Sequence, residues 1–81
     1  MTAYVPTEED VRWFEDMFSS LVDGGLLAFP ASMLIYRIDK EHKTLMLQNP
    51  EVLEVPYSTA IHCMTIETCK AIGYDVTVIE P

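Results

Sequence analysis

The chain has 81 residues, and 13 acidic residues against 5 basic ones give it a formal net charge of -8. So short a chain forms a single domain, residues 1–81, because domains typically contain about 100–150 residues. The acidic excess argues against direct nucleic-acid binding and against docking on an anionic membrane, since both depend on Lys and Arg. Because 49% of the residues are apolar, the composition is typical of a folded domain and not of a disordered acidic tail.

The N-terminal residues lack the basic region of an export signal. The longest uncharged stretch, residues 24–36, is too short to span a bilayer. The only cysteines, Cys63 and Cys69, are too few for a secreted protein built on disulfides. We therefore expect a cytoplasmic protein with free thiols.

The first predicted element is an amphipathic helix that ends at Asp23. Thr7 is a good N-cap, and the acids that follow it suit the positive end of the helix dipole. Asp10 stands at the third helical position, a weaker relative of the capping box. The glycines after Asp23 are typical of a helix end. Apolar side chains recur on one side of this helix and acidic ones on the other.

A β-hairpin is predicted next. Residues 26–29 are a short apolar run, either a strand or an extended entry into the hairpin. Residues 32–38 and 44–48 are rich in strand formers, and the charged connector 39–43 suits a hairpin tip. Since the first of these strands carries apolar residues on both faces, we expect it to be central in the sheet or covered on both sides.

The C-terminal half predicts three further elements. Residues 51–55 lie between two prolines and are a candidate edge strand. Residues 58–72 predict a second helix ending at Gly73, and residues 74–79 alternate as a strand. The order α-β-β-(β)-α-β predicts an α+β domain, with two helices on one face of a mainly antiparallel sheet of three or four strands.

Soft metal ligands and nucleophiles are few. His62, Cys63 and Cys69 are expected on the side of the second helix that faces away from the core, and their spacing fits neither a zinc site nor a Cys–His pair. His42 lies at the hairpin tip. Glycine-rich phosphate loops and nucleophile elbows are missing from the sequence. We expect no metal, no cofactor and no catalysis, with a thiol, histidine or carboxylate enzyme as a remaining alternative.

The acidic side of the first helix is the most distinctive feature. We expect it to bind a basic protein surface, because a row of carboxylates attracts such partners. Mimicry of DNA phosphates is a weaker hypothesis, since Arg12 interrupts the row. A solvated helix side is the simplest alternative. The acids concerned are Glu8, Glu9, Glu15, Asp16 and Asp23.

Surplus hydrophobicity predicts an exposed apolar interface. Trp13 stands at the border of the first helix, and Met33 and Ile35 add apolar side chains to the strand that follows. Patches of this kind mark contacts with a partner or with another copy of the chain. Small cores benefit most from association, so we expect a homo-oligomer or a protein partner.

A small anionic ligand is the alternative partner. Residues 37–43 carry three bases against two acids, and such a group of cations could receive a nucleotide phosphate between subunits. A solvated turn with charges of both signs is the simpler interpretation. The residues of this alternative site are Arg12, Arg37, Lys40 and Lys43.

In size and acidity the chain resembles the small inhibitors and accessory proteins that bacteriophages and other mobile elements encode. This resemblance of class implies a partner such as a host defence component with a basic surface. The sequence therefore predicts a non-enzymatic acidic binding protein that acts by occupying a macromolecule. The alternative is a homo-oligomeric binder of a small anionic ligand.

Overall fold

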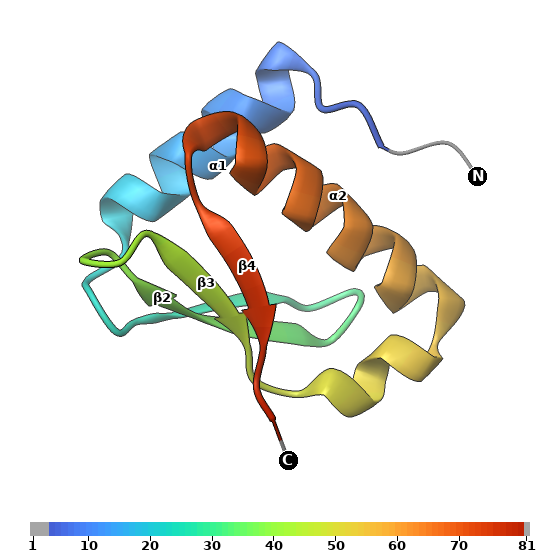
Figure 1. Ribbon diagram of the computed structural model, residues 1–81. Helices are drawn as coiled ribbons and strands as arrows, with labels where there is room; N and C mark the ends of the chain where they lie inside the picture. Colours follow the sequence, from blue (N-terminus) through green and yellow to red (C-terminus); the bar gives the residue numbers. More distant parts are fainter. Residues whose placement is uncertain (1–3, 81) are drawn as a thin grey trace.

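Two α-helices and a four-stranded sheet form an α+β domain in the computed structural model, which describes residues 4–80 (Figure 1). The predicted fold class is confirmed. The elements in chain order are α1 (Glu8–Ser20), β1 (Leu26–Phe29), β2 (Leu34–Asp39), β3 (Thr44–Leu47), the 3-10 helix η1 (Pro50–Glu54), α2 (Pro56–Ile72) and β4 (Asp75–Val78).

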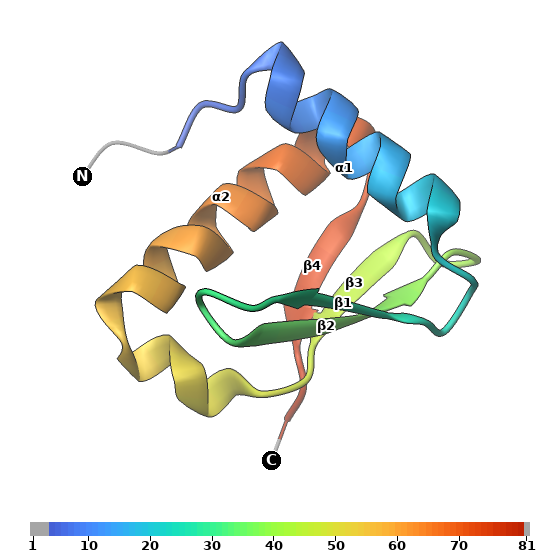
Figure 2. The ribbon, with the colours of Figure 1, turned by 180° about the vertical axis from the view of Figure 1, so that it is seen from behind.

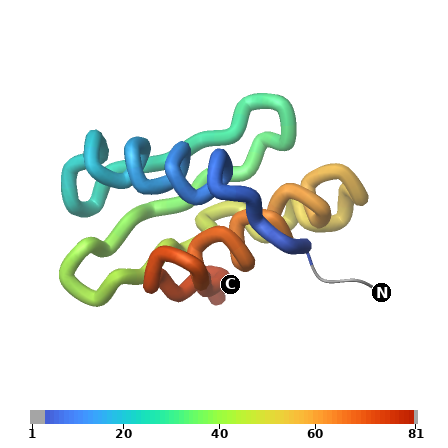
Figure 3. The backbone as a smooth tube through the Cα atoms, turned by 90° about the horizontal axis from the view of Figure 1, so that it is seen from above, coloured from blue at the N-terminus to red at the C-terminus, as the bar shows by residue number. Residues whose placement is uncertain are grey.

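The strands follow one another across the sheet in the order β1-β2-β3-β4. The first two pairings are antiparallel and the third, between β3 and β4, is parallel. The parallel pairing requires a crossover, which α2 supplies. Figure 2 shows the sheet from behind, with β1 and β2 in front of β4, and Figure 3 shows α1 and α2 next to each other and inclined at an angle.

The sheet has a core face and an open face. Leu34, Tyr36 and Ile38 of β2 are fully buried under the helices, whereas Arg37 between them is exposed. Alternation of this kind is typical of a sheet with one solvated face. The sequence predicted that β2 is either central in the sheet or covered on both sides. It is central, and helices cover only one of its faces.

Helix α1 begins as predicted and ends earlier. The Thr7 side chain accepts from the Asp10 N–H at 3.1 Å, and the Asp10 carboxylate accepts from the Thr7 N–H at 3.0 Å, so the capping box is complete. The helix stops at Ser20 and Leu21 is extended. The Gly24 N–H bonds to the Ile38 carbonyl at 2.8 Å, which draws the chain into the sheet before Asp23 could continue the helix.

The predicted edge strand at residues 51–55 is wrong, because Pro50–Glu54 is a 3-10 helix. The proline at its first position has no N–H to donate to a sheet ladder. Its fixed backbone angle also suits the first residue of a helix. Val52 and Leu53 both pack against the core. A strand would turn these neighbours to opposite faces, so the helical turn buries more apolar surface.

Helix α2 ends as predicted at Gly73, whose φ of 85° is the left-handed conformation that glycine adopts readily. Its buried side differs from the prediction, because His62 and Cys69 face the core. This side is mostly polar and its groups are satisfied locally. Thr65 and Thr68 donate to the carbonyls one turn earlier at 2.9 and 2.8 Å, and His62 bonds across to β2.

A candidate protein-binding surface

An apolar pocket of about 280 Å³ lies between α1, α2 and the turn that joins β1 to β2. Three elements far apart in the sequence therefore build it. The pocket is lined by Asp10, Trp13 and Phe14 from α1, by Phe29 at the end of β1, by Pro30, Ala31 and Ser32 from the turn, and by Tyr57, Ile61 and Met64 from α2.

Trp13, the only tryptophan of the chain, forms one wall of the pocket. Its ring centroid lies 5.2 Å from that of Phe14 and 6.0 Å from that of Phe29. These contacts hold one side of the indole while 48% of the residue stays exposed. A large aromatic side chain fixed in this way offers contact area at little cost in conformational entropy.

Hydrogen bonds fix the base of the pocket. The buried Ser58 hydroxyl donates to the Ser32 carbonyl at 2.8 Å and so ties the first turn of α2 to the β1–β2 turn. Ser32 in turn donates to the Phe29 carbonyl at 3.2 Å. Tyr57, next to Ser58, remains 54% exposed at the mouth. The pocket is thus preformed, with aromatic rings on two sides.

The charges around the pocket are negative. Asp10 is the one acidic or basic residue in its lining, and a hydrogen bond from the Tyr4 hydroxyl holds the pKa of this carboxyl below its usual value. Glu9 precedes Trp13 by one helical turn and Asp16 follows it by nearly one, so both exposed carboxylates flank the indole. A ligand that enters here meets apolar walls and the Asp10 carboxylate, with two further carboxylates about one helical turn to either side of Trp13.

The predicted acidic row is divided by the structure. Glu9 and Asp16 accompany Trp13, whereas Glu8 and Glu15 line a different pocket with Arg12, on the other flank of α1. Asp23, predicted on the same helix side, lies outside the helix, and that placement is wrong.

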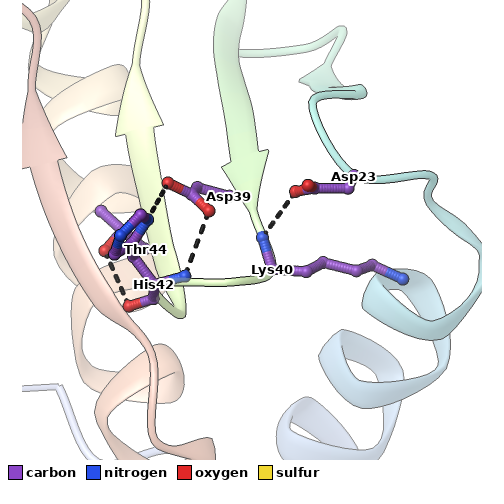
Figure 4. Close-up of polar contacts among 5 residues, drawn as sticks. All are labelled: Asp23, Asp39, Lys40, His42 and Thr44. Atoms are coloured by element: carbon purple, nitrogen blue, oxygen red, sulfur yellow. Dashed lines mark hydrogen bonds and ion pairs between the residues drawn. The ribbon is translucent and has the colours of Figure 1, made fainter.

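Asp23 has a structural partner instead. Its carboxylate accepts from the Lys40 backbone N–H at 2.8 Å, which anchors the β2–β3 turn (Figure 4). The Lys40 side chain points away from Asp39 and His42 in the same view.

The predicted apolar interface is also divided. Trp13 lines the pocket, and Met33, 67% exposed with a φ of 63°, belongs to the adjoining β1–β2 turn. Ile35 is half-buried and lies on the open face of the sheet, because it alternates with the buried Leu34 and Tyr36. The structure brings two of the three residues to one region.

The bases of the alternative anion site are not gathered. Arg12, Arg37 and Lys40 line three different pockets, and the Arg37 guanidinium donates to the Gly24 carbonyl. Lys43 lies in the β2–β3 turn with a φ of 50°. This arrangement gives an anion no common point at which the four cations could bind it.

The pocket around Arg37, of about 620 Å³, contains three acids. One of them, Asp39, accepts from the His42 ring at 2.7 Å (Figure 4). The His42 backbone N–H also donates to this carboxylate and, with the ring, lowers its pKa. The other two acids are Asp23 and Glu41, so this pocket does not favour an anionic ligand.

A buried polar contact between α2 and β2 was not predicted from the sequence. Nδ1 of His62 lies 2.7 Å from the Tyr36 hydroxyl, and burial lowers the pKa of His62. Of the thiols, Cys63 is exposed, while Cys69 is fully buried with its pKa raised to about 12 by burial. One sequence signal points to this buried polar side of α2: polar residues stand at helical spacing where a core-facing side should be apolar.

Within residues 4–80, no three His, Cys, Asp or Glu side chains come together as a group that could hold a metal ion. None of the helices in this part of the chain has the length and apolar character needed to cross a membrane. Comparison of the chain with protein-family models, curated proteins and solved structures gave no match.

Proposed function

We propose that the protein is a non-enzymatic binding protein that occupies a basic, partly apolar surface of a partner protein. The observation that supports this most strongly is the placement of Trp13, half exposed on a preformed apolar pocket and flanked by Glu9 and Asp16. Aromatic side chains in such positions are typical anchors of protein interfaces. The carboxylates would steer and orient a cationic partner.

Three interactions with this surface favour a partner segment that carries Lys or Arg beside apolar residues. The pocket accepts an apolar side chain, Trp13 offers its ring face to a cation, and the carboxylates pair with the same cation. A host defence protein with a basic surface, the class implied by size and acidity, meets this description. A small anionic ligand has less support, because three of its four candidate cations line separate pockets and the fourth, Lys43, lines none of these three.

Trp13 provides the test, since it is the only tryptophan and lines the pocket. We would titrate the protein with two short lysine–valine peptides. In the alternating peptide serine occupies every second position, so that lysine and valine share one face of an extended strand. In the second peptide the lysine and valine residues have helical spacing. The account predicts that at least one of them shifts the Trp13 emission to shorter wavelength, because the bound peptide displaces water from the indole.

Two control peptides make this test specific. Replacing lysine by glutamate should abolish the shift, and lysine without valine should bind more weakly. An unchanged emission with both lysine–valine peptides, or an equal response to the glutamate peptide, would contradict the proposed function.

A further inference from the structure

Strand β1 has a free edge. Within residues 4–80 it lies at the end of the sheet and pairs only with β2, where Ala28 stands opposite Ile35. The Ile35 backbone points away from β1, since its N–H donates to Asn49 Oδ1 at 3.0 Å and its carbonyl accepts from Gln48 at 2.8 Å. Ala28 and Ile35 are therefore a pair that exchanges no ladder hydrogen bonds.

The same alternation applies to Leu26, two residues earlier. The N–H and C=O groups of Leu26 and Ala28 both point outward, away from β2. Outside the ladder, none of the residues from 4 to 80 forms a backbone hydrogen bond with either of them. Four backbone groups are thus available to an added strand.

The residues of this edge carry little protection against pairing. Natural sheets guard exposed edges with charged residues, proline or bulges, or by keeping the edge strand short. Within the short strand β1, Leu26–Phe29, no residue is charged and none is proline, and Pro30 follows directly after the strand. The opposite edge strand, β4, begins with Asp75, and Glu80 follows it.

Apolar side chains lie on both sides of the free edge. On the helix side, Trp13 packs against Phe29 at the end of β1, and both residues line the apolar pocket. On the open side, Leu26 is 51% exposed. An added strand would turn alternate side chains toward these two apolar surfaces.

We propose that an extended segment of the partner adds to β1 as a fifth strand, with apolar side chains facing Trp13 and the pocket and with Lys or Arg beside Glu9 and Asp16. This inference rests on the proposed function and names the form in which the partner binds. Main-chain hydrogen bonds to Leu26 and Ala28 provide affinity, and the pocket provides specificity, as in other cases of strand addition.

The charges favour this partner over a second copy of the chain. Antiparallel pairing of β1 with β1 of another molecule would place both α1 helices on the same side of a joined sheet. That side would then carry the Glu9 and Asp16 carboxylates of both molecules, each of which already has a net charge of -8. Like charges across an interface disfavour association, whereas a basic segment neutralises them.

Amide hydrogen exchange measured by NMR tests this arrangement in the unmodified protein. In the free protein, the Leu26 and Ala28 amides should exchange fast, and those of Leu27 and Phe29, which face β2, should be protected. The alternating lysine–valine peptide should slow exchange at Leu26 and Ala28 by about tenfold or more. A peptide that shifts Trp13 emission and leaves these amides unchanged would refute strand addition and leave the proposed function intact.

A pair of variants gives a second measurement. Ala28→Pro removes the outward N–H without removing a ladder hydrogen bond, so it should weaken the alternating peptide about tenfold. Ala28→Ser keeps the N–H and should bind the alternating peptide about tenfold more tightly than Ala28→Pro does. Equal affinities for both variants, with circular dichroism unchanged, would overturn the inference.

Sedimentation of the free protein tests whether a second copy of the chain, and not a partner segment, occupies the edge of β1. The inference predicts a monomer with fast-exchanging Leu26 and Ala28 amides. A dimer in which both amides are already protected would show that a second copy occupies the edge and would overturn the inference. The Trp13 emission titration separates strand addition from the proposed function. If neither lysine–valine peptide binds, the proposed function itself is refuted.

Discussion

The hydroxyl of Tyr36 lies 2.7 Å from Nδ1 of His62, inside the protein. Tyr36 belongs to β2 and His62 to α2, so the contact joins the sheet to the helix above it. The two rings are also stacked, with an interplanar angle of 12°. Burial raises the pKa of Tyr36 and lowers that of His62, so both groups are neutral in the folded protein near pH 7.

Tyr36→Phe should destabilise the protein by about 1–3 kcal/mol, because it leaves a buried ring nitrogen of His62 without its partner. The ring volume is retained, so the loss reports the hydrogen bond and not a cavity. Urea unfolding followed by circular dichroism measures the change. The exposed Tyr57 is the matched control, and Tyr57→Phe should leave the free energy of unfolding nearly unchanged. Equal stabilities of the Tyr36 variant and the unmodified protein would refute the structural role of this pair.

Acidification should destabilise the protein through His62. Its pKa is lower in the folded state than in the unfolded state, so the unfolded chain binds the proton more readily. The contribution of neutral, buried His62 to the free energy of unfolding is complete above the unfolded pKa of about 6.5. It is lost as the pH falls below that value. Denaturation at a series of pH values should show this loss, and His62→Gln should remove it. Asp10 and Asp39, whose pKa values are lowered, act in a separate window below about pH 4.

Asp23→Ala should weaken the β2–β3 turn, because the Lys40 N–H loses its acceptor. We expect a loss of up to about 1 kcal/mol in the free energy of unfolding, since the bond is exposed. Asp23→Asn retains a side-chain oxygen and should lose less. Thermal unfolding measures both variants. A variant as stable as the unmodified protein would show that this contact does not anchor the turn.

The two thiols should differ in reactivity. Cys63 is exposed, whereas Cys69 is fully buried and its pKa is raised to about 12. An alkylating reagent at neutral pH should therefore modify Cys63 in the native protein and Cys69 only after unfolding. Mass spectrometry after digestion locates the adducts. Modification of Cys69 at the same rate as Cys63 would show that α2 opens readily.

Local patterns in the sequence were sufficient to predict several elements. The capping residues Thr7 and Asp10 defined the start of α1, and Gly73 defined the end of α2. The strands of the hairpin were recognisable because residues 32–38 and 44–48 are rich in strand formers and are joined by a charged connector. Each of these signals depends on neighbours in the chain.

The features that were predicted wrongly depend on tertiary contacts. Asp23 left the helix because Gly24 bonds to Ile38, a residue of β2. His62 entered the core because Tyr36 offers it a hydrogen bond across the interior. The pocket could not be predicted either, since Trp13 becomes part of it only where the β1–β2 turn and α2 meet α1.

Matched charge reversal separates the surface around Trp13 from overall charge as the cause of peptide binding. The variants Glu9→Lys/Asp16→Lys and Glu8→Lys/Glu15→Lys change the net charge equally, but only the first pair flanks Trp13. The account predicts that the first double variant binds a lysine–valine peptide about tenfold or more weakly, as two lost ion pairs beside an apolar site imply, while the second loses much less. Equal losses in the two double variants would show that overall charge, and not the surface around Trp13, attracts the peptide, and would contradict the account.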